Sequence, residues 1–139
     1  MARLKKRYFQ VEIITPDHPA IKHQAVQVIA PGKGGLFGVL INHAPAIFAL
    51  EIGLLKVEAI GGDKYYTISG GAAYITNNVM KIVTDSAEDI ETLDVERAKR
   101  ARDRALERLK SRQENIDQVR AKAALARALN RLRAVQLLE

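Results

Sequence analysis

Hydrophobic and polar residues alternate along the first part of the chain. The alternating segments are residues 8–14, 25–30, 54–59, 64–69, 72–77 and 79–84. A period of two is typical of strands that are buried on one face. Short stretches rich in Gly, Pro and Asn separate the segments, and one of them, residues 69–71, predicts a turn. Such connections leave no room for crossover helices, so the pattern predicts a β-sandwich or flattened barrel.

The pattern changes after a cluster of acidic residues that ends at Asp94. From Val95 to Glu139 the chain contains no Gly and no Pro, and good helix formers dominate it. The carboxylate of Asp94 is suited to cap a helix by accepting a backbone N–H from Glu96 or Arg97.

A polar stretch at residues 111–115 predicts a turn between two helices, which then pair as an antiparallel hairpin. The fold class is therefore mainly β plus α. We place a β-sandwich domain at residues 1–90 and a helical hairpin at residues 91–139.

The predicted contact between the two helices is weak. Its inward positions are Val95, Ala98, Ala101, Ala105 and Leu109 on the first helix, and Ile116, Val119, Ala123, Ala126, Leu125, Leu129 and Leu132 on the second. Five of these twelve positions are Ala, and burying one methyl group contributes only about 0.8 kcal/mol. Ordering one residue costs about 1–2 kcal/mol. We expect the hairpin to need docking, a ligand or a partner to fix its shape.

Charge is distributed unevenly along the chain. The net charge is +6, and residues 95–139 contain 13 Lys and Arg against 6 Asp and Glu. An electrostatic partner is therefore expected to meet the helical part. The chain has no Cys, which excludes disulfides and thiolate chemistry. It shows no signal-peptide pattern and no run of about 18 apolar residues, so we expect no membrane insertion.

Catalytic and metal-binding motifs are missing from the sequence. The histidines His18, His23 and His43 have no Ser or carboxylate at a useful spacing, so we assign no catalytic residue and no metal ligand. The Gly-rich stretch at residues 31–38 fails as a phosphate loop, because Gly34 stands where such a loop needs Ser or Thr after Lys33.

Nucleic-acid binding is an alternative suggested by the basic helices, but two features argue against it. The cations are interspersed with carboxylates, which predicts ion pairs within one solvated face; the expected pairs are Glu96–Arg100, Lys99–Asp103 and Arg104–Glu107. The helical part also has no aromatic residue to stack on bases. A basic adaptor for nucleic acid or acidic protein surfaces remains the alternative function.

One group of residues predicts an anion site. Asp94 and Arg97 begin the first helix, and Arg127 and Arg131 share one face of the second. An antiparallel hairpin brings these guanidinium groups together, and guanidinium groups hold phosphate through paired hydrogen bonds. Leu93 and the small Ala98 would then form the floor of the cleft. A plain network of ion pairs is the alternative interpretation.

Three motifs carry a resemblance to a known family. Residues 38–47 read GVLINHAPAI, residues 93–98 read LDVERA and residues 124–132 read ALARALNRL. They resemble the epsilon subunit of bacterial F-type ATP synthases, called delta in mitochondria. The first motif departs from the family at Ile41, where Pro is usual.

The resemblance implies a ten-stranded β-sandwich, a two-helix hairpin and a non-catalytic role in the central stalk. It implies that gamma, the c ring and the alpha/beta hexamer are partners, with the chain peripheral to the cytoplasmic face of the cell membrane. No cofactor is required. ATP is a regulatory ligand, and the implied contacts are Glu88, Leu93, Asp94, Arg97, Ala98, Arg127 and Arg131.

Two protein-binding surfaces are also expected. The contacts with the c ring and gamma are assigned to Lys33, Leu36, Phe37 and His43. When the hairpin extends and inhibits hydrolysis, its Arg-rich face is expected to meet acidic segments of the catalytic beta subunits. That face consists of Arg100, Arg104 and Arg108.

Overall fold

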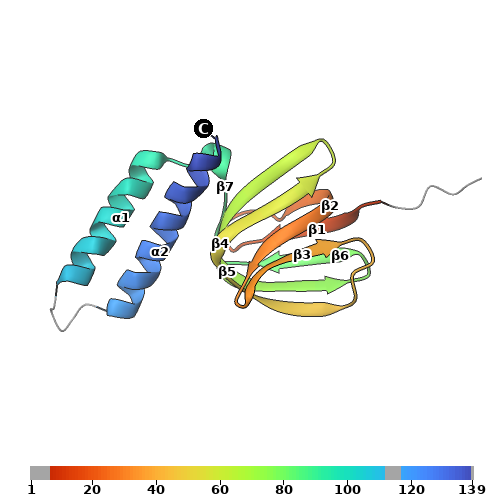
Figure 1. The fold of residues 1–139 in the computed structure, drawn as a ribbon, viewed down its shortest axis with the longest axis horizontal. Helices are drawn as coiled ribbons and strands as arrows, with labels where there is room; N and C mark the ends of the chain where they lie inside the picture. Colours follow the sequence, from red (N-terminus) through yellow and green to blue (C-terminus); the bar gives the residue numbers. More distant parts are fainter. Residues whose placement is uncertain (1–6, 112–116, 139) are drawn as a thin grey trace, which may run out of the picture. The chain divides into compact units, whose positions relative to one another are not determined.

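The structure, a computed structural model, describes residues 7–111 and 117–138 of the chain (Figure 1). It has seven strands: β1 (Phe9–Ile14), β2 (Ile21–Gly32), β3 (Gly35–Leu40), β4 (Ala46–Ala59), β5 (Gly62–Thr76), β6 (Val79–Val83) and β7 (Ala87–Asp89). The helices are η1 (Ile90–Thr92), α1 (Val95–Lys110), α2 (Gln118–Val135) and η2 (Gln136–Leu138). The chain divides into two compact units, and the division falls between Ala87 and Glu88.

The first unit is a sheet that closes on itself. Its strand order is β1-β6-β5-β4-β2-β3, β7 pairs with β5, and β1 also pairs with β2. β1 runs parallel to β6 and antiparallel to β2. This double pairing wraps the sheet around a core of fully buried side chains that includes Val11, Ile13, Val28, Leu55, Ile68, Met80 and Ile82. The prediction of a β-sandwich followed by two helices is confirmed.

The strands are fewer than the ten that the resemblance implies, and three of them are longer than the segments that the sequence predicts. β2, β4 and β5 contain 12, 14 and 15 residues, and irregular register between β2 and β4 lets these two strands change direction without ending. The turn predicted at residues 69–71 is wrong, because β5 runs through it. Gly70 and Gly71 have φ angles of 90° and 112°, which glycine adopts without strain, so they bend the strand rather than break it.

Both long helices begin at an aspartate cap. The Oδ1 atom of Asp94 accepts the backbone N–H of Arg97 at 3.1 Å, as the sequence predicts. Asp117 caps α2 in the same way, through the N–H of Arg120 at 3.1 Å. Apart from Ser111, the predicted turn at residues 111–115 lies outside the described residues, and so does Ile116.

The second unit pairs α1 and α2 side by side and antiparallel (Figure 1). Its buried alanines recur seven residues apart, with Ala98 and Ala105 on α1 and Ala121 and Ala128 on α2. Two helical turns separate positions of this spacing, so each pair lies on one helix face. Val119, predicted to point inward, is 76% exposed, because α2 buries the face of Ala121 instead.

Gly71 should tolerate no side chain. A Cβ atom there would overlap the carbonyl oxygen of Val83, and the φ of 112° disfavours any other residue. We expect Gly71→Ala to lower the free energy of unfolding of the sandwich by at least about 2 kcal/mol in urea denaturation followed by circular dichroism. Gly34→Ala is the matched control, because a Cβ atom there has no neighbour within 4 Å. Equal stability of the two variants would contradict this account of the β5 bend.

Candidate functional site

An ion pair joins the two ends of the helical unit. The Nε atom of Arg131 on α2 donates to Oε1 of Glu88 at 2.8 Å, and Nη2 lies 2.6 Å from the same oxygen. The two side chains are 27% and 36% exposed, so water still reaches the pair. Asp89, the next residue, holds the backbone near Glu88 in place through two hydrogen bonds. Asp89 accepts the N–H of Glu91 at 3.0 Å, and its carbonyl oxygen accepts the Thr92 hydroxyl at 2.9 Å.

The other residues predicted to contact a nucleotide lie in the same unit. Leu93 and Arg127 are half-buried, Arg97 is exposed, and Ala98 is buried. The carboxylate of Asp94 accepts a backbone N–H and thereby fixes the start of α1. The 3-10 helix η1, just before α1, packs against α2, so the chain folds back as the spacing predicts. The structure therefore brings Glu88 and Arg131 into direct contact and leaves Arg97 open to a ligand.

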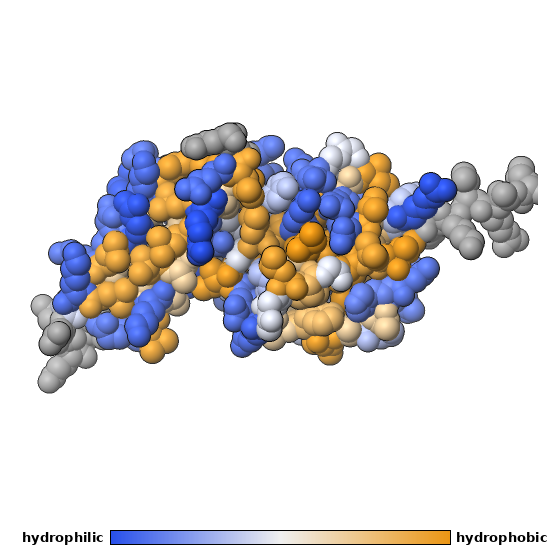
Figure 2. All heavy atoms as spheres, in the orientation of Figure 1, coloured by the Kyte–Doolittle hydropathy of each residue, from blue (hydrophilic) through white to orange (hydrophobic). Residues whose placement is uncertain are grey.

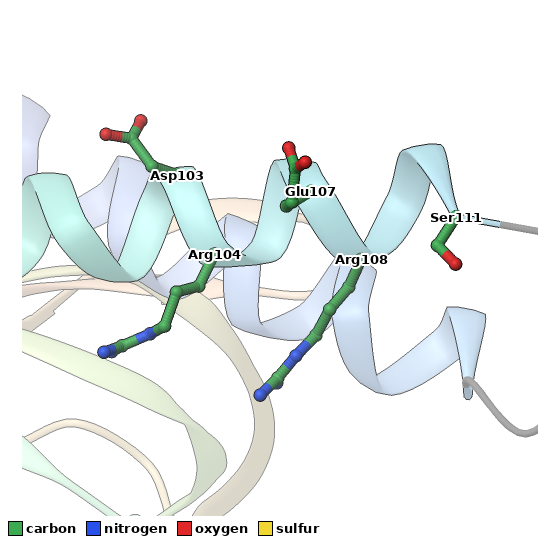
Figure 3. A pocket seen from close by; sticks show the side chains of 5 residues that line it. All are labelled: Asp103, Arg104, Glu107, Arg108 and Ser111. Atoms are coloured by element: carbon green, nitrogen blue, oxygen red, sulfur yellow. The ribbon is translucent and has the colours of Figure 1, made fainter.

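Two arginines and two carboxylates in the second half of α1 project in different directions. Figure 3 shows Arg104 and Arg108 projecting from one side, and Asp103 and Glu107 from the opposite side. With Ser111 these four residues line an open, shallow depression, which is separate from the residues predicted to bind a nucleotide.

The ion pairs on α1 differ from those predicted. Within the described residues they are Glu96–Lys99 at 3.7 Å and Arg102–Asp103 at 3.0 Å. The predicted pairs fail because Glu96 reaches three residues ahead and Asp103 turns to its neighbour in sequence. Arg100, Arg104 and Arg108 consequently have no ion pair within the part of the chain that the structure describes, so their charges remain available to a partner.

A loop at one end of the sandwich is held by two asparagines. The backbone N–H of Asn42 donates to Oδ1 of Asn78 at 2.7 Å, and Nδ2 of Asn78 donates back to Oδ1 of Asn42 at 3.2 Å. The carbonyl oxygen of Asn78 also accepts the N–H of Gln10 at 3.0 Å. We call the Asn42–Asn78 pair the asparagine clasp. It ties the β3–β4 loop to the β5–β6 turn.

The clasp holds the loop that carries His43. The ring of His43 donates from Nδ1 to the carbonyl oxygen of Ala44 at 2.6 Å and lies edge-on to Phe48, with 6.1 Å between the ring centroids. Phe48 stacks on Phe37 at 4.2 Å. Two of the predicted interface residues, Phe37 and His43, thus belong to an aromatic cluster with Phe48. Leu36 is exposed next to Phe37 in sequence, and Lys33 is exposed on the preceding turn.

Apolar side chains remain uncovered on this unit. Leu36 is 74% exposed, Leu40 55% and Ile47 72%. The view in Figure 2 shows hydrophobic surface interrupted by hydrophilic residues. Exposed apolar side chains of this size on β3 and β4 fit a protein-binding surface better than a catalytic cleft.

The histidine His23 and possible metal sites were the other candidates for a functional site. His23 is hydrogen-bonded through Nε2 to the hydroxyl of Tyr66 at 2.7 Å, in a partly buried environment. Within the described ranges, no group of three or more His, Asp or Glu residues is arranged to hold a metal ion. No helix of these ranges is long and apolar enough to cross a membrane.

Two family models match the chain along almost its whole length. The ATP synthase delta/epsilon chain β-sandwich domain matches residues 8–90, and the long α-helix domain of the same chain matches residues 91–136. The chain belongs to the ATP synthase delta/epsilon family. Members of this family are non-catalytic subunits, which confirms the prediction that the chain is not an enzyme by itself.

Curated relatives agree with this assignment to the delta/epsilon family. The ATP synthase epsilon chain of Nitratidesulfovibrio vulgaris is 42% identical over 111 residues, which cover 80% of this chain and 83% of the relative. The ATP synthase epsilon chain of Syntrophomonas wolfei is 40% identical over 109 residues, covering 78% and 80%.

Solved structures of two mitochondrial ATP synthases contain similar folds. A chain in the Euglena gracilis complex, solved with its c-ring, has a TM-score of 0.77 at 25% identity and covers 93% of this chain and 81% of that chain. A chain in the central stalk and c-ring of Tetrahymena thermophila has a TM-score of 0.56 at 15% identity, covering 95% and 99%. The second likeness concerns the fold alone.

Sequence reasoning missed three features of these sites. The asparagine clasp joins residues 36 positions apart, and the only local signal is the pair of asparagines at residues 77–78, interpreted as a turn. Phe48 was not assigned to the interface, although it contacts both Phe37 and His43. The partnership of Glu88 with Arg131 spans 43 positions, and helical periodicity carries no information about it.

The contribution of the asparagine clasp to stability can be measured separately from the cost of backbone strain at this turn. Asn77 and Asn78 have φ angles of 50° and 60°, so alanine at either position incurs a similar backbone cost. Only Asn78 bonds to Asn42, and we expect Asn78→Ala to cost about 0.5–1.5 kcal/mol more than Asn77→Ala in urea denaturation. Hydrogen exchange of the Asn42 amide should accelerate in Asn78→Ala alone. Equal exchange in both variants would show that the clasp does not hold the loop.

Proposed function

We propose that the chain is a rotor subunit of a rotary ATP synthase, in which it couples ion translocation to ATP synthesis and restrains ATP hydrolysis. The observation that carries this proposal is the match of both units, in order, to the two domains of the delta/epsilon chain. The sandwich would attach to gamma and the c ring, and the complex would hold it at the cytoplasmic face of the membrane without insertion.

The sandwich is suited to a fixed attachment. Its closed sheet leaves a well-packed core, and the asparagine clasp orders the loop that carries His43. The exposed Leu36, Leu40 and Ile47 supply apolar area that a partner can bury. We assign this surface, with Lys33, Phe37 and His43, to the c ring and gamma.

The helical unit is suited to movement. Alanines dominate its buried positions, so its packing contributes little free energy and a second arrangement is accessible at a cost of a few kcal/mol. As one continuous helix, the 45 residues from Val95 would reach roughly 67 Å. Arg100, Arg104 and Arg108 would then meet acidic segments of the catalytic subunits.

ATP is the proposed ligand of the closed hairpin. Arg97, Arg127 and Arg131 would surround the phosphates, while Leu93 and Ala98 would border the base. Asp94 would fix the start of α1, and Glu88 would be a further contact. Guanidinium groups match the geometry and charge of phosphate. A sensor of cellular ATP needs a dissociation constant of about micromolar to millimolar, which corresponds to about −8 to −4 kcal/mol.

A basic adaptor for nucleic acid or acidic protein is the weaker candidate. The family match does not favour it, and nucleic-acid binding to the cationic helices should weaken steeply with salt. Assembly with gamma should resist the same increase in salt, because apolar contacts contribute to it.

Regulation by the hairpin depends on its arginine face. We expect replacement of Arg100, Arg104 and Arg108 by Ala to raise ATP hydrolysis by the assembled enzyme and to leave assembly unchanged. The control removes three charges elsewhere in the same unit, by replacing Lys110, Lys122 and Arg133. An equal rise in both triple variants would indicate a general charge effect, and loss of assembly in the first would indicate a structural surface.

Nucleotide binding is tested by titration calorimetry of the isolated subunit with MgATP. We expect Arg127→Ala to weaken binding by about 1.5–3 kcal/mol, the contribution of one charge-assisted contact. The control is Arg133→Ala on the same helix, because the Nε atom of Arg133 donates to the backbone oxygen of Leu129 at 3.4 Å. Wild-type protein that gives no heat at millimolar ATP would refute the nucleotide site.

A further inference from the structure

A cluster of three hydroxyl groups lies where the chain leaves the sandwich. It consists of Ser69 on β5 and of Thr84 and Ser86, which follow β6, and we call it the hydroxyl clamp. The backbone N–H of Ser86 donates to the Ser69 hydroxyl at 3.0 Å, and the Thr84 hydroxyl donates to the carbonyl oxygen of Ser86 at 3.2 Å. The N–H of Ser69 donates to the Thr84 hydroxyl at 3.3 Å. These bonds form a closed set, since each residue is joined to both others.

The close approach of two strands brings the members of the clamp together. Gly71 lies so near the end of β6 that a Cβ atom on it would overlap the carbonyl oxygen of Val83. Glycine permits this approach because it has no Cβ atom, and Ser69 consequently reaches Thr84. Thr84 is buried, and its own N–H donates to the carbonyl oxygen of Ile14 at 3.1 Å. The clamp is therefore fastened to β1 as well as to β5.

The clamp ends at the division between the two units. Its last member directly precedes Ala87, the end of the first unit. On the other side of the division, Asp89 accepts the N–H of Glu91 at 3.0 Å, and its carbonyl oxygen accepts the Thr92 hydroxyl at 2.9 Å. Between these two sets of hydrogen bonds lie Ala87 and Glu88.

We propose that the hydroxyl clamp fixes the pivot of the helical unit, by confining the bending that accompanies its movement to residues 87 and 88. The proposal rests on the movement of the hairpin proposed above. Bending is absorbed where the backbone is held least, and the clamp holds the chain up to Ser86. β7 offers less resistance, because it pairs with β5 through a strand of only three residues.

A fixed pivot limits the space that the helical unit can reach. Without the clamp, residues 84–86 would join the bending segment and would lengthen it by at most about 10 Å, at roughly 3.3 Å per residue. A longer tether spreads the helices over a larger volume and lowers their effective concentration at any one partner surface. The clamp therefore strengthens the restraint of ATP hydrolysis although it contacts neither nucleotide nor partner.

The test compares Thr84→Val with Thr67→Val in the full chain. Valine keeps the shape of threonine but has no hydroxyl group, so Thr84→Val removes two bonds of the clamp and leaves the bond between the Ser86 N–H and Ser69. Thr67→Val is the matched control on β5. Thr67 is equally buried, with 4% exposure against 3% for Thr84, and its side chain forms no hydrogen bond with a described residue.

Hydrogen exchange measures whether the clamp acts as a unit. We expect the Ser86 amide to exchange about tenfold faster in Thr84→Val than in wild type, although its own acceptor is still present, because the clamp opens cooperatively. The Met80 amide in the middle of β6 reports general destabilisation, so the Ser86 rate is compared with it in each variant. In Thr67→Val we expect the ratio of the two rates to stay at its wild-type value.

ATP hydrolysis by the assembled enzyme measures the pivot. We expect Thr84→Val to raise hydrolysis about two- to fourfold, because effective concentration falls roughly as the −3/2 power of the length of the free segment. Thr67→Val should leave hydrolysis unchanged at the same subunit content. Faster Ser86 exchange together with raised hydrolysis in Thr84→Val alone supports the proposal.

Two results overturn the proposal, and a third concerns the proposed function. If the Ser86 amide exchanges alike in both variants, the hydroxyl groups do not hold this turn. If its exchange accelerates in Thr84→Val but hydrolysis does not rise above that of Thr67→Val, the clamp does not set the pivot. If removal of residues 91–139 leaves hydrolysis unchanged, the proposed restraint by the hairpin fails, and the exchange result alone decides whether the clamp holds the turn.

Discussion

The double pairing of β1 is the constraint on which the rest of the sandwich depends. β1 forms hydrogen bonds with β2 on one side and with β6 on the other, so strands from both ends of the unit meet across a single strand. The closed sheet buries Val11 and Ile13 of β1 completely. A closed sheet resists deformation, because opening it would expose backbone N–H and C=O groups along two strand edges at once.

The helical unit is built on a different principle. Its helices begin at well-defined caps, Asp94 and Asp117, but the hydrophobic residues that they bury fully are all alanines within the described residues. Caps fix where a helix begins and contribute nothing to where it packs. The chain thus combines a closed, well-packed sheet with a helical unit whose arrangement depends on a few contacts.

The Glu88–Arg131 pair adds a specific contact to the weak packing of the second unit. The pair is partly exposed, so water screens it and it contributes little free energy by itself. The arrangement of the two helices therefore depends on small contributions of similar size.

The sequence by itself determined the class of fold, the start of α1 at Asp94 and the concentration of positive charge in the helices, because alternation, capping and composition are local properties. Only the tertiary structure decided the course of β5 through Gly70 and Gly71, since glycine at positive φ serves a turn and a bent strand equally well. The pairing of Arg131 with Glu88 and of Asn42 with Asn78 likewise depends on contacts between distant segments. Helical periodicity predicts which residues share a face of a helix, but it does not predict which side chain from a distant segment contacts them.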